Sequence, residues 1–432
     1  MLDIKFIRQN PELVKEAAQK KRVKVDIDQL LAVDERRRHV LQELEQKRSE
    51  QNKGSVGGPK SPVELEKLKK LKEEVKILEE GIGHIEKEFE EIMLQVPNIP
   101  SQDTPVGPDE SGNKVLREWG KIPKFSFKPK EHWELGQQLN ILDVEHAGIV
   151  SGTRFNYLKG EAALLEFALV QHALSVLVNE KVLKKIAKSA KLDISTKAFV
   201  PVVPPVLIRP DIFQKMARLE PKEERYYIPS DDLYLVGSAE HTLGPLHINQ
   251  TLNEKDLPIR YVGFSTAFRR EAGSYGKDTK GILRVHQFDK VEMESFTTSD
   301  SSVKEQEFFI AIQEYLMQSL KLPYRVTMIC TGDMGGPDAR QVDIETWMPG
   351  QNLYRETHTA DFMSDYQARR LNTKVRIKDK NEFVHMNDAT VLAIGRTIIA
   401  ILENYQTEKG TVVIPKVLQK YMFGIKEIKR TI

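Results

Sequence analysis

The stretch FSTAFRREAGSYGKDTKGILRVHQFDKVEMESF, residues 264–296, carries side chains suited to bind an anionic ligand that has a flat ring. A strand through its second half would alternate side chains between two faces. One face would hold Arg284, His286, Phe288, Lys290 and Glu292, and the other Leu283, Val285 and Val291. Cations and a carboxylate are costly to bury against an apolar core, whereas guanidinium groups bind phosphates and carboxylates well. The pattern predicts a ligand site, with a salt-bridged surface strand as the alternative.

Arg396 stands in a second candidate segment, VHMNDATVLAIGRTIIAILENYQ, where we expect a helix over residues 390–405. Apolar residues cover most of its circumference: Val391, Leu392, Ile394, Ile398, Ile401 and Leu402. An arginine is rarely buried without a partner, so Arg396 should meet a carboxylate or a phosphate. A structural ion pair and a ligand contact fit this segment equally well.

Missing motifs exclude several other chemistries. The chain contains no G-x-x-x-x-G-K-[ST], no G-x-G-x-x-G, no H-E-x-x-H and no G-x-S-x-G. Cys330 is the single cysteine, so we expect neither an intrachain disulfide nor a structural zinc site, and a reducing cytoplasm is the natural setting. If a nucleotide binds, side chains must hold its phosphates.

The elements that position these residues predict an α+β fold with an antiparallel sheet. Expected helices span residues 161–190, 302–321 and 390–405. Expected strands span residues 260–269, 282–296, 324–330, 341–347 and 353–359. The connection EAGSYGKDTKG, residues 271–281, is short enough to join neighbouring antiparallel strands. No signal peptide or membrane span is expected, because charges interrupt every apolar stretch of sufficient length.

A heptad pattern near the start of the chain predicts a coiled-coil arm over about residues 28–96. The apolar residues of its second half are Leu68, Leu71, Val75, Leu78, Ile82, Ile85, Phe89, Ile92 and Val96, and Leu30, Val33, Val40 and Leu44 keep the register upstream. Arg37 and Lys47 occupy the remaining seam positions. The segment NKGSVGGPKSP, residues 52–62, should reverse the chain, giving an antiparallel hairpin about 50 Å long.

The net charge of +2 conceals segregated charges. Residues 47–76 hold nine basic and five acidic side chains, whereas residues 77–91 hold one basic and six acidic ones. Lys67, Lys69, Lys70 and Lys72 therefore gather toward the tip, where they suit a polyanion. The alternative is a coiled coil with a solvated lysine face. Residues 101–118, rich in proline and glycine at their start, are expected to be a linker between this N-terminal domain, residues 1–100, and a larger domain, residues 119–432.

Several long stretches together resemble the seryl-tRNA synthetases of the bacterial type, which are class II aminoacyl-tRNA synthetases. They include MLDIKFIRQNPELV, VGSAE, FRREAGSYGKDTKGILRVHQFDKVE, ICTGDMG, DIETWMPGQ, DYQARRLN and IGRTIIAILENYQ, and the resemblance runs over the whole chain. It implies a class II catalytic domain, an antiparallel sheet flanked by helices, behind an N-terminal tRNA-binding arm.

The resemblance also implies a reaction and its participants. Serine attacks the α-phosphate of ATP to form seryl-adenylate, and the seryl group then passes to the 3′ end of tRNA(Ser), with tRNA(Sec) as a further expected substrate. The implied cofactors are ATP and Mg²⁺, the implied assembly is a cytoplasmic homodimer, and no membrane partner is implied. Neither step needs a nucleophilic side chain, because orientation and charge neutralisation suffice.

Matching positions carry implied roles. The implied catalytic residues are Arg269, Glu356 and Arg396. ATP would contact Arg269, Arg270, Glu271, Val285, Phe288, Glu356, Thr357, His358, Thr359 and Arg396. L-Serine would contact Ser238, Ala239, Glu240, Arg269, Glu292 and Thr390. Glu356 and Thr359 would hold Mg²⁺ with ATP, so we expect a strand end or bulge that brings both to one face. tRNA would contact Lys53, Lys60, Lys67, Lys69 and Lys70.

Two segments depart from the pattern of the family. THTADF, residues 357–362, stands where many members read SSCSN, and HMNDAT, residues 385–390, stands where many read HTLNGS. Asp388 thereby replaces a neutral asparagine, and Phe362 a polar residue. Two alternatives follow: a non-catalytic relative that binds RNA or senses an amino acid, and a ligase for another small amino acid. The presence of Arg269, Glu356 and Arg396 argues against a retired site.

Overall fold

The computed structural model describes residues 1–55, 61–272 and 280–430. The chain divides into two compact units, residues 1–99 and 100–432. The boundary agrees with the expected end of the N-terminal domain. Lys60 and the central parts of the two predicted connections, residues 52–62 and 271–281, lie outside the described residues.

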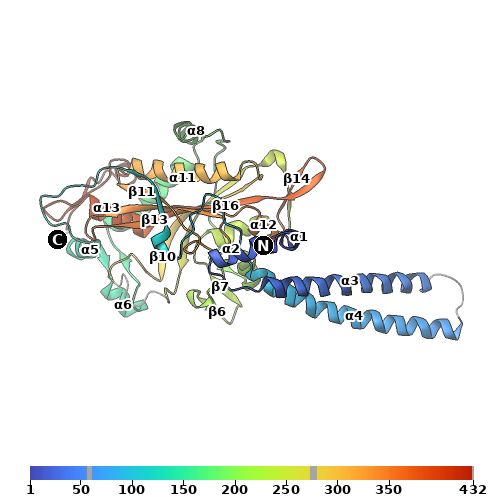
Figure 1. Cartoon of the computed structure of the whole chain (residues 1–432). Helices are drawn as coiled ribbons and strands as arrows, with labels where there is room; N and C mark the ends of the chain where they lie inside the picture. Colours follow the sequence, from blue (N-terminus) through green and yellow to red (C-terminus); the bar gives the residue numbers. More distant parts are fainter. Residues whose placement is uncertain (56–60, 273–279, 431–432) are drawn as a thin grey trace. The chain divides into compact units, whose positions relative to one another are not determined.

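The first unit consists of an antiparallel helical hairpin and two short helices at its base. Its helices are α1 (Ile4–Gln9), α2 (Pro11–Lys20), α3 (Ile27–Ser55) and α4 (Pro62–Gln95) (Figure 1). Helix α3 continues through residues 52–55, which were expected to belong to the turn. Ser61 caps α4: its backbone N–H and side chain each lie 2.8 Å from Glu64 Oε2, which fixes the start of the helix.

Polar partners line the arm beside its narrow apolar seam. Arg37, which stands at a seam position, donates to Glu86 at 3.2 Å and lies 5.1 Å over the Phe89 ring. Lys47 reaches Glu74 at 2.6 Å. The seam therefore tolerates both cations because each has an anionic partner on α4. At the base, Ile7, Val14, Leu30 and Met93 are buried together, so α1 and α2 pack on the hairpin ends.

The second unit is built on an eight-stranded sheet in the order β1-β11-β12-β13-β16-β10-β9-β4. All neighbours are antiparallel except β4 and β9. The strands are β1 (Lys114–Trp119), β4 (Val200–Val202), β9 (Ile259–Phe268), β10 (Gln287–Thr297), β11 (Tyr324–Met328), β12 (Arg340–Met348), β13 (Leu353–Phe362) and β16 (His385–Ala393). The predicted α+β class is confirmed.

Residues 101–118 are not a linker, because they are bound to the second unit. Ser101 N–H donates to Ala339 O at 2.8 Å, and the Thr104 hydroxyl donates to the same oxygen at 3.2 Å. Strand β1 then forms the edge of the sheet beside β11. Their prolines and glycines set extended and turn conformations along a packed surface, which composition alone does not distinguish from a free linker.

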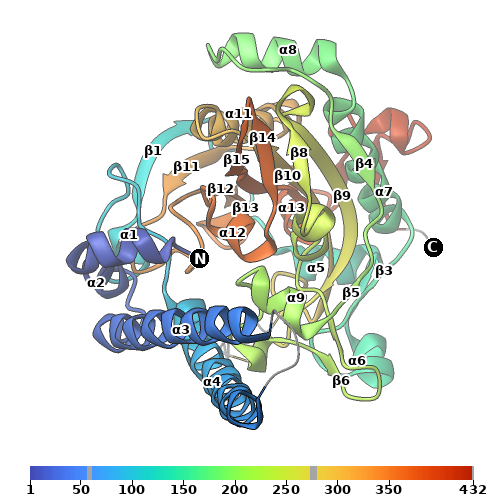
Figure 2. The same ribbon diagram turned by 90° about the vertical axis from the view of Figure 1, so that its right-hand side faces the viewer.

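Helices cover the sheet, and two of them differ in their bounds from the expected helices. The helices are α7 (Glu161–Leu177), α8 (Glu180–Ser189), α11 (Ser302–Ser319) and α13 (Ile394–Asn404). Figure 1 shows α11 along one face of the sheet, and α7 packs against α13 and β9 (Figure 2). The expected helix over 161–190 is broken at residues 178–179. The helix expected from residue 390 begins only at Ile394, because residues 390–393 complete β16.

Shorter elements complete the unit. They are α5 (His132–Leu139), α6 (Glu145–Ser151), α9 (Pro210–Lys215), α10 (Glu240–Leu243), α12 (Tyr366–Leu371), β2 (Leu142–Asp143), β3 (Tyr157–Leu158), β5 (Leu207–Ile208), β6 (Tyr227–Ile228), β7 (Leu233–Leu235), β8 (Thr251–Asn253), β14 (Lys374–Ile377), β15 (Lys380–Phe383), β17 (Val412–Val413) and β18 (Glu427–Ile428). Within the described ranges, no single helix is long and apolar enough to cross a membrane; α7 and α8 qualify only as a pair bent by 78°.

Candidate active site

A polar cavity of about 290 Å³ opens on one face of the sheet. Helix α11 lies on the other face, where Gln313 donates to the backbone carbonyl oxygens of Thr359 and Thr390. Strands β10, β13 and β16 form its floor, and the start of α13 forms one wall. The sequence-predicted residues that line it are Glu240, Arg269, Glu271, Val285, Phe288, Glu356, Thr357, Thr359, Thr390 and Arg396. Residues more than 150 positions apart therefore converge on one cavity.

A bulge in β13 brings Glu356 and Thr359 to the same face. Ile344 of β12 pairs with His358, whereas the next residue, Glu345, pairs with Glu356, so the register passes over Thr357. One extra residue shifts the alternation by one position. Glu356 and Thr359, three residues apart, therefore both line the cavity, and the expected bulge is confirmed.

Arg396 meets the backbone and side chain of Glu356. Its Nη1 donates to Glu356 Oε1 at 3.0 Å and to the Glu356 carbonyl oxygen at 2.9 Å. Partial burial raises the pKa of Glu356, but the guanidinium groups of Arg396 and Arg269 outweigh this effect and hold the pKa below its usual value. Glu356 is thus a carboxylate that faces the cavity between two cations, and the partner predicted for Arg396 is found.

Arg269 and Phe288 form a second wall. The Arg269 guanidinium lies 5.4 Å over the Phe288 ring, and its Nε donates to Gly237 O at 3.1 Å. Glu271, beyond the end of β9, accepts from Arg284 Nη1 at 3.3 Å. An aromatic ring flanked by guanidinium groups suits a heterocycle that carries phosphates.

The segment of residues 282–286 is not the strand that alternation predicted, because β10 begins at Gln287. Leu283 and Val285 were assigned to the face away from the ligand, yet both line the cavity together with Arg284. The buried His132 holds this segment, since its Nε2 accepts the Ile282 N–H at 3.1 Å. Backbone groups bound to a side chain do not follow a strand ladder, so period-two alternation fails here.

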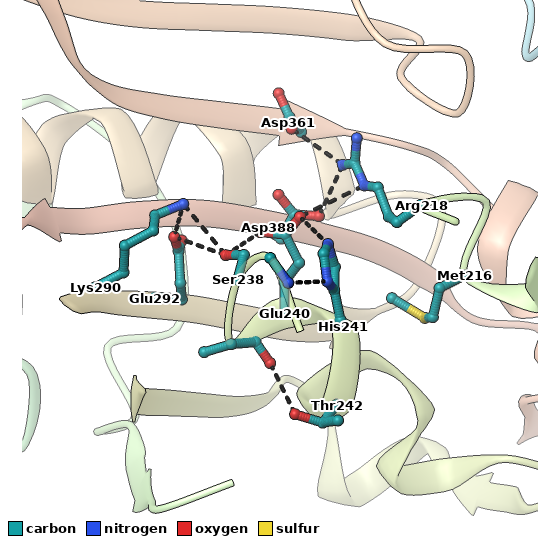
Figure 3. A network of polar contacts seen from close by, with 12 residues as sticks. Met216, Arg218, Ser238, Glu240, His241, Thr242, Lys290, Glu292, Asp361 and Asp388 are labelled. Atoms are coloured by element: carbon teal, nitrogen blue, oxygen red, sulfur yellow. Dashed lines mark hydrogen bonds and ion pairs between the residues drawn. The ribbon is translucent and has the colours of Figure 1, made fainter. Parts of the chain in front are cut away.

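A hydrogen-bonded network forms the inner end of the cavity (Figure 3). Ser238 Oγ lies 2.9 Å from Glu240 Oε2 and 3.1 Å from Glu292 Oε1, and Lys290 donates to it at 3.2 Å. Lys290 and Glu292 form an ion pair, and Thr390 donates to Glu292 Oε1 at 3.2 Å. Four of the residues expected to bind an amino acid, Ser238, Glu240, Glu292 and Thr390, are therefore connected. Ser238, Ala239 and Glu292 lie behind the cavity lining.

Arg218 is the main residue that the sequence did not reveal. Its Nη2 lies 3.2 Å from Asp361 Oδ2 and 3.3 Å from Asp388 Oδ2, and it also reaches Asp338 at 3.3 Å. Arg218 Nε is 3.5 Å from Glu240. Its local sequence, ARLEPKEER, has the charges of a surface loop, so no sequence signal identified it. Lys290 stood on the predicted ligand face but was not among the predicted site residues.

Two predicted ATP contacts lie elsewhere. The exposed Arg270 stacks over Tyr226 at 4.7 Å and donates to Arg225 O at 3.0 Å. His358 is buried on the other face of the sheet, with its Nδ1 2.8 Å from Thr357 Oγ1. Burial lowers the pKa of His358 to about 3. The bulge at Thr357 places His358 on the opposite face from Glu356.

The lysines predicted to contact tRNA lie on the arm. Lys53, Lys67, Lys69 and Lys70 are exposed there.

The donors present suit Mg²⁺ bound together with phosphates. Glu356 offers a carboxylate and Thr359 a hydroxyl, both hard oxygen donors. No group of three or more His, Cys, Asp or Glu residues that could hold a metal by itself occurs in the described part of the chain. This sparse set fits Mg²⁺, which keeps waters and takes further ligands from phosphates.

Comparisons with known proteins agree with this geometry. A family model described as the seryl-tRNA synthetase N-terminal domain matches residues 1–100, and one for the tRNA synthetase class II core domain (G, H, P, S and T) matches residues 225–405. A serine–tRNA ligase from Coprothermobacter proteolyticus is 41% identical over 98% of this chain and 100% of its own length. One from Nitrosopumilus maritimus is 36% identical over 99% and 100%.

A solved structure extends the likeness to the fold. The seryl-tRNA synthetase from Pyrococcus horikoshii complexed with ATP superposes with a TM-score of 0.89 at 38% identity, covering 100% of both chains. Identity at this level over the full length, together with the cavity and the arm, leaves one assignment. The chain belongs to the seryl-tRNA synthetases, the class II serine–tRNA ligases.

Proposed function

We propose that the chain activates L-serine with ATP and transfers the seryl group to the 3′ end of tRNA(Ser). The observation that carries the proposal is the single cavity in which Arg269, Phe288 and Arg396 adjoin the network of Ser238 and Glu292. The Pyrococcus synthetase was solved in complex with ATP, which supports a nucleotide at this cavity.

In the first step, the serine carboxylate attacks the α-phosphate and pyrophosphate leaves. Arg269 would hold the α-phosphate, Phe288 would stack on the adenine, and Arg396 would hold the γ-phosphate. Mg²⁺, bound by Glu356 and Thr359 with the phosphates, would supply further charge neutralisation. The side chains orient the reactants and stabilise charge, so no covalent enzyme intermediate is needed.

The inner network supplies the serine site. Glu240 carries a negative charge because Arg218 outweighs the effect of burial and holds its pKa at about 2. This carboxylate suits the serine ammonium, while Ser238, Glu292 and Thr390 offer donors and acceptors for its polar groups. Partners that need a hydroxyl reject alanine strongly, because they would otherwise remain buried and unpaired.

ATP–pyrophosphate exchange with serine, threonine, alanine and glycine tests the activation step. We expect exchange with serine, a smaller rate with threonine, and little with alanine or glycine. Exchange without a serine preference would support a ligase for another small amino acid, and no exchange with any of the four would support a non-catalytic relative. Either result overturns the proposal.

The arm and the assembly form the second part of the proposal. Lysines near the arm tip would contact tRNA, and membership in the family supports a homodimer. A variant in which a short glycine linker replaces residues 38–85 keeps the base cluster of Ile7, Leu30 and Met93. It should exchange pyrophosphate normally but lose tRNA charging, and equal loss of both would contradict a tRNA-specific arm.

A further inference from the structure

Strands β13 and β16 are neighbours in the floor of the cavity, but they pair over only part of their length. Their pairing ends at Ala360 of β13 and Ala389 of β16. The next residues along the two strands are Thr359 and Thr390, and both line the cavity. The paired part of the two strands therefore stops where the cavity lies.

Each of the two strands carries a bulge immediately beyond this point. The register of β13 against β12 passes over Thr357, and the register of β16 against β10 passes over Val391. A bulged strand bends, and its twist increases locally. In this part of the described chain, strand pairing therefore no longer fixes the distance between Thr359 and Thr390.

Gln313 of α11 joins the two strands at this point from the opposite face of the sheet. Its Nε2 donates to the backbone carbonyl oxygens of Thr359 and Thr390, at 2.8 Å in both cases. Carbonyl oxygens only accept hydrogen bonds, so the NH₂ end of the amide must face them. One nitrogen atom thus holds a backbone atom of each strand.

The surroundings of Gln313 are costly for an amide. Its side chain is fully buried, and its Oε1 has no hydrogen-bond partner among the described residues. A buried acceptor without a partner disfavours folding relative to a well-packed apolar side chain. Packing of α11 on the sheet would therefore be served better by leucine or methionine, and the two bonds of Nε2 are what those residues lack.

The two threonines that Gln313 holds belong to different halves of the proposed reaction. Thr359 would bind Mg²⁺ and the phosphates of ATP together with Glu356. Thr390 donates to Glu292 in the network that would bind serine. The serine carboxylate must approach the α-phosphate at a defined distance and direction, and small misplacements of reactants cost large factors in rate. The separation of the two strands therefore bears directly on the first step.

We propose that Gln313 is a positioning residue for amino acid activation, which sets the separation between the phosphate end and the serine end of the cavity. This inference rests on the proposed function. Gln313 does not line the cavity, so it acts through Thr359 and Thr390 and not through a contact with substrate. Its loss should leave the serine network intact and change how that network is placed relative to the phosphates.

Gln313→Met provides the kinetic test, in serine-dependent pyrophosphate exchange. Methionine fills a similar volume without a donor, so both carbonyl oxygens lose their bond. We expect kcat to fall at least about tenfold, while the KM for serine stays within about threefold of wild type.

Gln313→Glu is a second variant that keeps the shape of the side chain. A protonated glutamate has one donor and an ionised one has none, so in neither state can it bond both carbonyl oxygens. We therefore expect kcat to fall at least about fivefold in this variant as well.

Gln306, about two helical turns earlier on α11, offers matched control variants with the same two substitutions. Its side chain is also fully buried, and its Nε2 donates to Arg340 O at 3.0 Å and to Ala360 O at 2.8 Å. Neither Arg340 nor Ala360 lines the cavity, and β12 and β13 are already paired there. Gln306→Met and Gln306→Glu should lower the melting temperature at least as much as the Gln313 variants but keep kcat within about twofold of wild type.

Binding of seryl-sulfamoyl adenosine, an unreactive analogue of seryl-adenylate, reports on the cavity without turnover. The analogue has no β- or γ-phosphate, so its Kd should stay within about threefold of wild type in Gln313→Met. Unchanged kcat in the Gln313 variants, an equal loss in the Gln306 variants, or analogue binding weakened more than about tenfold overturns the inference. If wild type shows no serine-dependent exchange, the proposed function and this inference both fail. Normal wild-type exchange combined with one of the three contrary outcomes refutes only the role of Gln313.

Discussion

Arg396 Nη1 lies 3.0 Å from Glu356 Oε1, so the first turn of α13 is joined to the bulged part of β13 across the cavity. Two groups expected to contact ATP and Mg²⁺ therefore hold each other in place. The ion pair is partly exposed, with side-chain exposures of 25% and 50%. Surface-exposed pairs contribute little to stability, so this pair matters mainly because it orients both groups.

Arg396→Lys should reduce pyrophosphate exchange without unfolding the protein. Lysine keeps the charge but cannot donate to both Glu356 oxygen atoms and a phosphate through a planar fork. We expect a loss of roughly 10²-fold in kcat/KM for ATP, of the size seen when one preorganised donor is removed. A melting temperature close to that of wild type is the control, and unchanged exchange would show that Arg396 is only structural.

His132 should act as a positioning residue for residues 282–286, which line the cavity where we propose that ATP binds. Buried Glu403 accepts from His132 Nδ1 at 3.1 Å and from the Gly350 N–H at 2.9 Å, which leaves Nε2 to accept from Ile282. His132→Ala should raise the KM for ATP roughly tenfold because a buried N–H loses its acceptor, while the KM for serine should change little.

Gly281→Ala provides an independent test of the same contact. Gly281 has φ of +73°, and a Cβ there would clash with His132 Nε2. We therefore expect the alanine variant to resemble His132→Ala in its KM for ATP. His146→Ala, at an exposed histidine paired with Asp143, serves as the control. A similar effect of all three variants would contradict a specific role for His132.

Glu166 should make stability depend on pH. Burial and a hydrogen bond with Asp289 raise its pKa to about 8 from 4.5. Between these values the folded state keeps a proton that the unfolded state has lost, so the free energy of unfolding falls as pH rises. Glu166→Gln removes this component, and its melting temperature relative to wild type should increase from about pH 5 to pH 8.

Thermal unfolding measured at intervals of pH checks this prediction. Glu180→Gln, at an exposed glutamate on α8, controls for the general effect of removing one negative charge. A difference between Glu166→Gln and wild type that stays constant over this range would show that Glu166 is ionised in the folded protein.

The arm lysines should affect tRNA charging alone. Lys67, Lys69 and Lys70 are exposed and form no ion pair within the described residues. Changing all three to glutamate should raise the KM for tRNA at least about tenfold, more so at low salt, and leave pyrophosphate exchange unchanged. The same change at the exposed lysines 184, 185 and 188 of α8 is the matched control. Equal effects of the two triple variants would indicate a nonspecific loss of charge.

Local patterns in the sequence predicted much of this molecule. The heptad spacing predicted the hairpin, because burial of an apolar stripe requires a partner helix. Arg396 amid apolar residues predicted its partner. The shared role that the family resemblance implies for Glu356 and Thr359, set against strand alternation, predicted the bulge. The resemblance to a family supplied the roles of the site residues, which spacing alone did not.

Tertiary structure decided the features that depend on distant neighbours. The strand expected over residues 282–286 gave way to a segment held by His132, some 150 positions earlier, and the expected linker became an edge of the sheet. The sequence by itself determined which elements form and which chemical groups they carry. Only the fold placed Arg218 among four carboxylates and set Glu294 beside Asp388, because strand register and desolvation arise from packing.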